Sequence, residues 1–200
     1  MRLINIWKHF YTITEHKIIV AKHCFRVGMY WQGLTHDLSK YSPSEFWQGC
    51  KYYQGFQSPN NAEREAKGYS SAWLHHKGRN KHHYEYWIDY SLKPVKCMAG
   101  MKMPLKYVNE MIMDRIAASK VYEGKAYTQH SPLAYYEKGK DAYMIHKDTR
   151  ALLEYILHML DEKGEEKTFA YIKRYMVGRK KYPRIPGPEK NDFLKNKEGF

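Results

Sequence analysis

The sequence predicts an all-α protein built as a single helical domain. Apolar residues recur at helical spacing along most of the chain, and no segment shows the alternation of a half-buried strand. The 200 residues, 43% of them hydrophobic, are enough to bury one core. We therefore expect one domain over residues 1–177, followed by a basic C-terminal extension over residues 178–200 that contains three prolines.

Helix boundaries are predicted where proline, glycine and capping residues interrupt the apolar pattern. Pro43, Pro104 and Pro132 each stand where a helix would begin, since proline is tolerated in a first turn. Gly124 and Gly164 stand where helices would end. The expected helices cover residues 3–30, 35–42, 43 onward, 70–77, 104–122, 131 onward, 148–164 and 165–177, with a loop and a short helix within 54–68.

The chain carries an excess of positive charge, +13 from 34 basic and 21 acidic residues. Such an excess attracts anions, so an anionic small molecule and nucleic acid are both expected partners. The longest apolar runs, such as residues 18–21, are far shorter than the ~20 residues of a membrane span. Lys8 and His9 interrupt any signal-peptide core. We expect a cytoplasmic protein without a membrane partner, and the oligomeric state is not predicted.

Several familiar sites are missing from the sequence. The three cysteines are widely scattered and form no CxxC pair, which excludes a zinc ribbon and a disulfide framework. The chain also lacks the GxxxxGK[ST], GxGxxG, GxSxG and HExxH motifs. Nucleotide-binding P-loops, Rossmann sites, serine hydrolases and zincin proteases are therefore not indicated.

Histidines are the most informative residues, and there are eleven of them. The adjacent His36 and Asp37 offer an imidazole nitrogen and a carboxylate oxygen, ligands that suit zinc, manganese, iron or cobalt. Upstream, His9, His16 and His23 recur every seven residues, which places them along one face of a helix. Apolar neighbours at helical spacing direct His23 inward, where a buried histidine needs a metal or an aspartate as its partner.

A dense histidine cluster lies between two tryptophans, with four histidines and an asparagine within nine positions. Solvated histidine tracts are typically tags or disordered segments, so the flanking aromatic residues indicate a folded site. We favour His76 and His83 as metal ligands. Their neighbours His75 and His82 are expected to support them or to face the substrate.

Asp114 is the last candidate ligand. Apolar residues such as Met111 and Ala117 surround it at helical spacing, so it is expected on a buried helical face. A buried carboxylate is costly unless it binds a metal or a cation. An ion pair with Arg115 or Lys120 is the alternative to a metal.

The order His, His-Asp, His, His, Asp on successive helices resembles the HD-domain superfamily of metal-dependent phosphohydrolases. The resemblance implies an HD-domain-like helical bundle that holds one or two divalent transition metal ions (Mn, Fe, Zn or Co). The residues that match its metal ligands are His23, His36, Asp37 and Asp114 for the first ion, and His76 and His83 for a second. Because only twelve residues separate His23 from His36, His16 remains an alternative first ligand.

The segments HDLSKYSPSEF, HHKGRNKHHYEYW and MDRIAASK are also similar to a family of small bacterial and phage proteins of unassigned function. That similarity covers about residues 20–125.

The resemblance implies hydrolysis of a nucleotide or another phosphate ester, with a metal-activated water as the nucleophile. Lys40 matches a lysine that neighbours the phosphate in the superfamily. Arg79 and Arg115 are expected to neutralise charge that develops on the phosphoryl oxygens, and Glu85 or a histidine that does not bind metal is expected to move protons. Helical scaffolds of this kind also host di-iron oxygenases, so redox chemistry is an alternative by analogy.

Two further functions belong to other classes. One is a nucleic-acid-binding protein or nuclease, because His76, Asn80 and His83 follow the HNH order, although they lie too close together for the hairpin and helix of that motif. The other is a non-catalytic helical protein with a structural metal, for which the coordination would be closed. Asp114 distinguishes the HD-like phosphohydrolase from the HNH-like nuclease, since only the HD-like site requires this residue.

Overall fold

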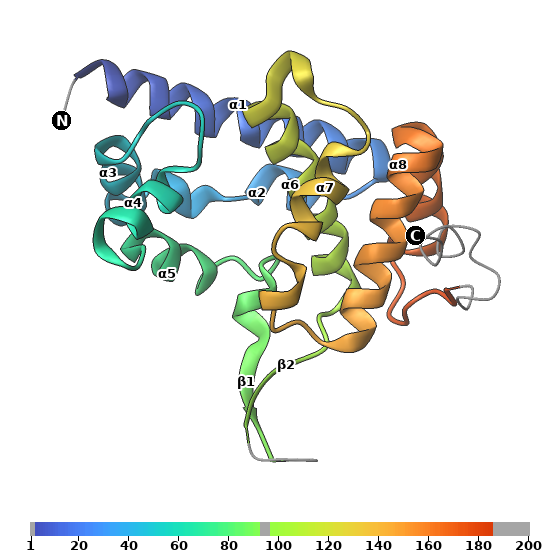
Figure 1. Cartoon of the computed structure of the whole chain (residues 1–200). Helices are drawn as coiled ribbons and strands as arrows, with labels where there is room; N and C mark the ends of the chain where they lie inside the picture. The colour runs from blue at the N-terminus through green and yellow to red at the C-terminus, as the bar shows by residue number, and fades with distance from the viewer. Residues whose placement is uncertain (1–2, 93–96, 186–200) are drawn as a thin grey trace, which may run out of the picture.

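Eight α-helices and one small hairpin make up the part of the chain that the computed structural model describes, residues 3–92 and 97–185 (Figure 1). Most of the predicted C-terminal extension, residues 186–200, lies outside that part. The elements in order are α1 (Leu3–Val27), α2 (Tyr30–Thr35), the 3-10 helix η1 (Leu38–Tyr41), α3 (Pro43–Lys51), α4 (Pro59–Lys67), α5 (Ser71–Lys77), η2 (Tyr84–Trp87), β1 (Ile88–Ser91), β2 (Cys97–Gly100), α6 (Leu105–Glu123), η3 (Gly124–Ala126), α7 (Ser131–Glu137), η4 (Lys140–Ala142) and α8 (Lys147–Tyr175). The predicted predominance of helices is confirmed.

The three longest helices, α1, α6 and α8, enclose the core. Helix α6 packs against both of the others and against α7, while α3, α4 and α5 gather around the first half of α1 (Figure 1). Apolar side chains three or four residues apart meet at this centre, as helical periodicity requires. The fully buried ones include Val20, Cys24, Val108, Ile112, Ile116, Leu152, Leu153, Ile156, Leu157 and Leu160.

Local signals place most helix ends as expected. Proline stands in the first turn of α3, α4 and α7. Gly28, with φ 88°, follows the last residue of α1, Val27, which lies three residues before the expected limit. Gly164, with φ 73°, breaks α8 where two separate helices were expected to meet. The predicted helix over 35–42 is wrong: α2 ends at Thr35, and a 3-10 turn follows it.

The hairpin contradicts the expectation that the chain contains no strand. Strands β1 and β2 are antiparallel, with Ile88 opposite Gly100 and Ser91 opposite Cys97. Each has only four residues, too few for an alternating pattern to stand out in the sequence. Gly100 allows a close approach, since a β-carbon there would lie 2.6 Å from the carbonyl oxygen of Met144. The hairpin therefore packs closely against the segment that precedes α8.

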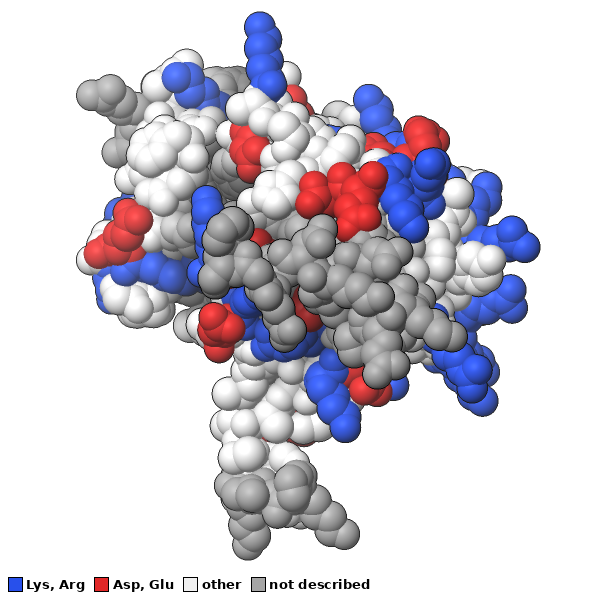
Figure 2. Space-filling view, turned by 45° about the vertical axis from the view of Figure 1, so that its right-hand side comes forward, with Lys and Arg blue, Asp and Glu red and all other residues white. Residues whose placement is uncertain are grey.

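Positive charge is spread over the surface. On the face shown in Figure 2, lysine and arginine side chains occur in several separate groups, and acidic side chains lie among them. None of the helices within the described ranges is long and apolar enough to cross a membrane.

Glu63 ties α4 to the start of α5. Its buried carboxylate accepts hydrogen bonds from the hydroxyls of Ser70 and Ser71, both at 2.7 Å, and from the backbone N–H of Ala72 at 3.3 Å. Burial alone would raise the pKa of Glu63, but the hydrogen bonds from Ser71 and Ser70 outweigh it and lower the pKa to about 2. The ionised carboxylate of Glu63 thus fixes the N-terminal end of α5, the helix that carries His75 and His76.

We predict that Glu63→Gln lowers the free energy of unfolding by about 2 kcal/mol at neutral pH, because it removes charge-assisted hydrogen bonds. Since the pKa of Glu63 is depressed on folding, its contribution is present above the unfolded value of 4.5 and is lost as the pH falls toward about 2. Denaturant unfolding at several pH values measures this difference. The exposed neighbour Glu65→Gln is the control, and an equal loss in both variants, or a difference independent of pH, contradicts the role.

Candidate metal centre

Asp37 lies at the junction between α2 and η1, in a strained backbone conformation. Its φ of 52° makes it the one non-glycine residue in the described ranges with a positive φ. Aspartate tolerates this left-handed region better than most residues, yet the conformation still costs about 1–3 kcal/mol. The turn directs the carboxylate into the molecule, where only 2% of the side chain is exposed.

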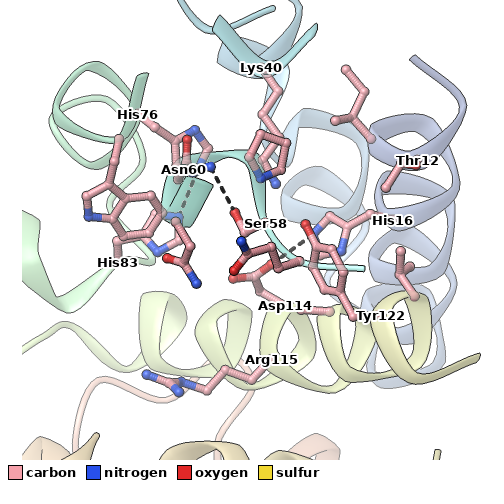
Figure 3. A pocket seen from close by; sticks show the side chains of 18 of the residues that line it. Thr12, His16, Lys40, Ser58, Asn60, His76, His83, Asp114, Arg115 and Tyr122 are labelled. Carbon is pink, nitrogen blue, oxygen red and sulfur yellow. Dashed lines mark hydrogen bonds and ion pairs between the residues drawn. The ribbon is translucent and has the colours of Figure 1, made fainter. Parts of the chain in front are cut away.

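The first group of donor atoms brings together helices α1 and α6 with the α2–η1 junction. His16, His36, Asp37 and Asp114 each offer one atom, and these atoms all lie within 4.8 Å of one another. His16 Nε2 lies 2.9 Å from Asp114 Oδ1, and His36 Nε2 lies 3.5 Å from the same oxygen. Figure 3 shows His16 and Asp114 facing each other at one wall of the cavity.

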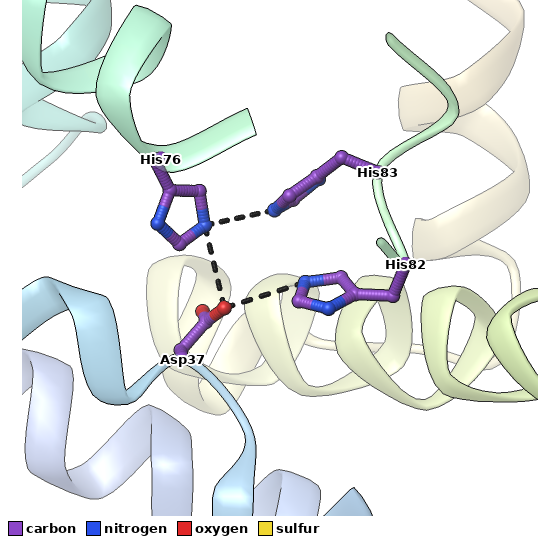
Figure 4. Close-up of side chains that lie close together, drawn as sticks. All are labelled: Asp37, His76, His82 and His83. Carbon is purple, nitrogen blue, oxygen red and sulfur yellow. Dashed lines mark hydrogen bonds and ion pairs between the residues drawn. The ribbon is translucent and has the colours of Figure 1, made fainter. Parts of the chain in front are cut away.

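The second group lies on the other side of Asp37 and uses α5 and the turn that follows it. His76 Nε2 and His82 Nε2 each lie 3.3 Å from Asp37 Oδ1, and His83 Nε2 lies 2.8 Å from His76 Nε2 (Figure 4). In the first group, His36 approaches the other oxygen, Oδ2, at 3.3 Å. Asp37 thus belongs to both groups and presents a different carboxylate oxygen to each.

Two buried glutamates contact the Nδ1 atoms of the histidine rings, on the side away from the donor groups. Glu110 Oε1 lies 3.0 Å from Nδ1 of His36 and 3.2 Å from Nδ1 of His82. Glu45 contacts Nδ1 of His76 at 2.7 Å. A carboxylate on Nδ1 fixes the tautomer of a histidine and leaves Nε2 to face a metal, as is typical of metal sites. The Nε2 atoms of His36, His76 and His82 therefore point toward the position where a metal would bind.

Five buried atoms at this point have no hydrogen-bond partner among the described residues. They are Nε2 of His16, His36 and His82, and both carboxylate oxygens of Asp37. Several lie within ion-pair distance of one another but lack hydrogen-bond geometry. Buried polar atoms are rarely left without a partner. Cations bound at the two groups would give these atoms partners, and their nitrogen and oxygen chemistry suits divalent transition metals.

Electrostatics keep the carboxylates in the form that binds a metal. Burial opposes ionisation of Asp37, but the charges of His36 and Lys40 outweigh it and hold its pKa well below the usual value. The close contacts of His16 and His36 with Asp114 overcome the same effect of burial and also keep the pKa of Asp114 low. Burial and the nearby Lys40 lower the pKa of His16, which leaves it neutral. The neighbouring carboxylates instead raise the pKa of His36, against the effect of burial, so a metal here would take the place of a proton.

A cavity of about 490 Å³ opens beside the two groups (Figure 3). His16, His76, His83 and Asp114 form part of its wall. Lys40, Glu85 and Arg115, three of the four predicted catalytic residues, also line it. The rest of the lining is mixed in character, and its aromatic members are Phe56, Trp73, Tyr84, Tyr122, Tyr135 and Tyr143.

The structure brings together most of the residues selected from the sequence. Five of the six predicted ligands belong to the two groups, namely His36, Asp37, His76, His83 and Asp114. His82, expected only as a neighbour, contributes a nitrogen directly to Asp37. Glu45 and Glu110 were not predicted, although Glu110 precedes Asp114 by four residues and so shares its face of α6.

Two predicted site residues lie elsewhere. His23 is two helical turns from His16, about 10.5 Å along α1, and its ring packs against Phe169 while Nε2 faces Lys120 Nζ at 3.2 Å. His16, the alternative, occupies the position expected of the first ligand. Arg79 follows the end of α5, is exposed, and does not line the cavity. For His23 the cause is that helical spacing predicts which face of α1 is buried but not which turn of that face meets a distant loop.

A comparison of the sequence with protein-family models identifies one family. The profile of a family of unknown function (DUF5662) matches residues 5–159, a range that contains every residue of the two donor groups. No curated protein and no solved structure gives a significant match.

We predict that His16→Gln removes metal from the protein and that His23→Gln does not. Elemental analysis of untagged protein after incubation with manganese or zinc measures the difference, with circular dichroism to confirm folding. Loss of metal in the His23 variant alone would restore the original assignment from the sequence.

Glu110→Gln should weaken metal binding by about 10–100-fold, because both His36 and His82 lose the carboxylate that orients them. Competition with a chromophoric chelator measures the affinity. Glu166→Gln is the matched control, as that side chain is 91% exposed on α8. Equal affinities in the wild type and the Glu110 variant would show that this carboxylate does not support the centre.

Proposed function

The chain belongs to that family of unknown function (DUF5662), and we propose that it is a metal-dependent phosphohydrolase that cleaves a phosphate ester. One observation carries the proposal: Asp37 joins two groups of buried imidazole and carboxylate donors beside a cavity that also contains the cations of Lys40 and Arg115. The order of these residues along the chain supports the resemblance to HD-domain phosphohydrolases.

The donor set fits one or two ions of manganese, iron, zinc or cobalt. His16, His36, Asp37 and Asp114 would hold one, and Asp37 with His76 and either His82 or His83 would hold the second. Ions of this kind lower the pKa of a coordinated water toward neutrality and withdraw charge from a phosphoryl oxygen. The cavity beside the groups leaves room for substrate, which distinguishes this arrangement from a closed structural site.

Lys40 and Arg115 supply the positive charge that a phosphate requires. Lys40 Nζ lies 2.6 Å from Asp37 Oδ2, and that carboxylate raises the pKa of Lys40 despite its burial, so the amine stays protonated. The guanidinium of Arg115 lies over the rings of Tyr136 and Tyr143, at 5.7 and 5.8 Å from their centroids. Its buried Nε has no hydrogen bond among the described residues. A phosphoryl oxygen that accepts a hydrogen bond from Arg115 would give this guanidinium a partner.

Glu85 is placed to give a proton to the leaving group. It lines the cavity, and one of its carboxylate oxygens is buried without a hydrogen-bond partner in the described part of the chain. Burial is the main cause that raises the pKa of Glu85, which increases the protonated fraction near neutral pH. A carboxylic acid with a raised pKa can protonate a departing alkoxide.

The aromatic and amide side chains in the lining favour a substrate with a flat or apolar group attached to the phosphate. Aromatic side chains such as Trp73 and Tyr122 line the cavity together with the amides of Asn60 and Asn61. Stacking on aromatic rings and hydrogen bonds to amides are how proteins hold flat heterocycles. The volume lies within the range of small-molecule sites, so a nucleotide is the substrate class to test first.

The nuclease alternative has less support. Asn80, the central residue of the HNH-like order, donates hydrogen bonds to Ser39 Oγ at 2.7 Å and to the carbonyl oxygen of His76 at 2.9 Å. Its side chain thus stabilises the turn after α5 and does not line the cavity.

We predict manganese-dependent hydrolysis of p-nitrophenyl phosphate or of nucleoside monophosphates. Arg115→Met should lower kcat/KM by about 100-fold or more, because it removes a charge that stabilises the transition state. Asp114→Asn should abolish both activity and metal binding. Arg174→Met, on the exposed side of α8, is the matched control and should retain full activity. An Asp114 variant that hydrolyses phosphate esters at the wild-type rate would contradict the proposal.

A further inference from the structure

Helix α1 has a buried stripe on one face and a largely apolar stripe with exposed side chains on the opposite face. The buried stripe faces the core and contains His9, Ile13, His16, Val20, His23 and Val27. The opposite stripe contains Ile4, Trp7, Tyr11, Thr14, Ile18, Ala21 and Phe25. Its large side chains are exposed, from 41% for Phe25 to 72% for Trp7. Figure 1 shows α1 along one edge of the molecule. Neighbouring segments touch the stripe only in part, since the hydroxyl of Thr14 hydrogen-bonds to that of Tyr41 at 3.0 Å and Phe25 packs on Tyr30.

The spacing of the residues in the exposed stripe indicates that a second helix can pack along it. Its members alternate at three and four residues over three heptads, which is the pattern of a helix that packs along another helix. A monomer rarely exposes a continuous apolar patch of this size without an interaction site. The residues beside the stripe are of both signs, with Lys8, Glu15 and Lys22 along one flank, so this face is not a uniformly basic surface for anionic lipid.

We propose that α1 of a second copy of this chain packs antiparallel along this stripe and forms a two-fold dimer. Most soluble oligomers are of this kind, with the same surface used twice. If the axis passes between residues 12 and 13, Trp7 faces Ile18 of the second copy and Tyr11 faces Thr14 of the second copy. At the ends, Ile4 then meets the small Ala21 of the second copy, so that large and small side chains alternate along the interface.

Charge complementarity selects the antiparallel arrangement. In this register Lys8 lies across from Glu15 of the second copy, and the two-fold axis repeats the pair. Within the described ranges neither residue forms an ion pair of its own. A parallel pairing would instead place Lys17 beside Lys22 of the second copy, where like charges repel.

The area available is sufficient for a stable dimer. Helix α2 and η1 run beside α1, since Lys17 Nζ donates to the carbonyl oxygen of Leu34 at 2.8 Å. They add Trp31, Leu34 and Leu38 to the exposed apolar surface, at 74%, 58% and 54% exposure. Together with the stripe they offer on the order of 900 Å² per copy, comparable with the roughly 800 Å² per partner of a standard interface. Because His16 is on the opposite face of α1, the dimer leaves the metal centre and its cavity open.

Sedimentation equilibrium of the full chain, with variants that carry charge on the stripe, tests this proposal. The wild type is expected to be dimeric, and Ile18→Glu should weaken the dimer by roughly tenfold or more. Leu74→Glu is the matched control, because Leu74 is 54% exposed on α5 away from the stripe, and it should leave the dimer unchanged. Circular dichroism confirms that both variants fold. A monomeric wild type, or equal weakening by both variants, would overturn the proposal.

A charge reversal tests the direction of the helices. Glu15→Lys should weaken the dimer, since it places like charges opposite Lys8 of the second copy. The double variant Lys8→Glu/Glu15→Lys should recover the wild-type affinity, because the exchanged pair is again complementary. A double variant that remains as weak as Glu15→Lys alone would overturn the antiparallel register.

Discussion

The carboxylate of Asp37 connects the parts of this structure that matter for its chemistry. Its left-handed backbone conformation, with φ 52°, turns the side chain inward between α1, α5 and α6. One oxygen then faces His36 and the other faces His76 and His82. Without this turn the two groups of donor atoms would share no residue. The local backbone strain is the cost of that arrangement, as at many functional sites.

The residues around Asp37 offset the energetic cost of burying several ionisable side chains. Glu45 and Glu110 bind the outer nitrogens of the histidines and so fix the direction of the inner ones. Lys40 balances part of the negative charge and keeps the pKa of Asp37 low. The inner atoms that still lack a partner are concentrated at one point, which is the pattern expected where a cation binds.

Local signals in the sequence predicted much of this fold, and tertiary contacts decided the rest. Pro43 and Gly164 act through their own backbone preferences, so they predicted a helix start and a break correctly. The pattern that selected His23 over His16 was ambiguous, because both lie on the buried face of α1, and only the return of the chain after α2 decides which of them meets Asp37. Glu110 was missed since a glutamate in a helix ordinarily faces solvent.

The most direct test of the central claim is a crystal structure of the untagged protein grown with manganese, with anomalous diffraction data. The account predicts one peak between His16, His36, Asp37 and Asp114, and a second about 3.5–4 Å away on the His76 and His82 side of Asp37 if two ions bind. An anomalous peak at His23 or on the surface alone, or the absence of any peak at Asp37, would contradict the assignment of this cluster as a metal centre.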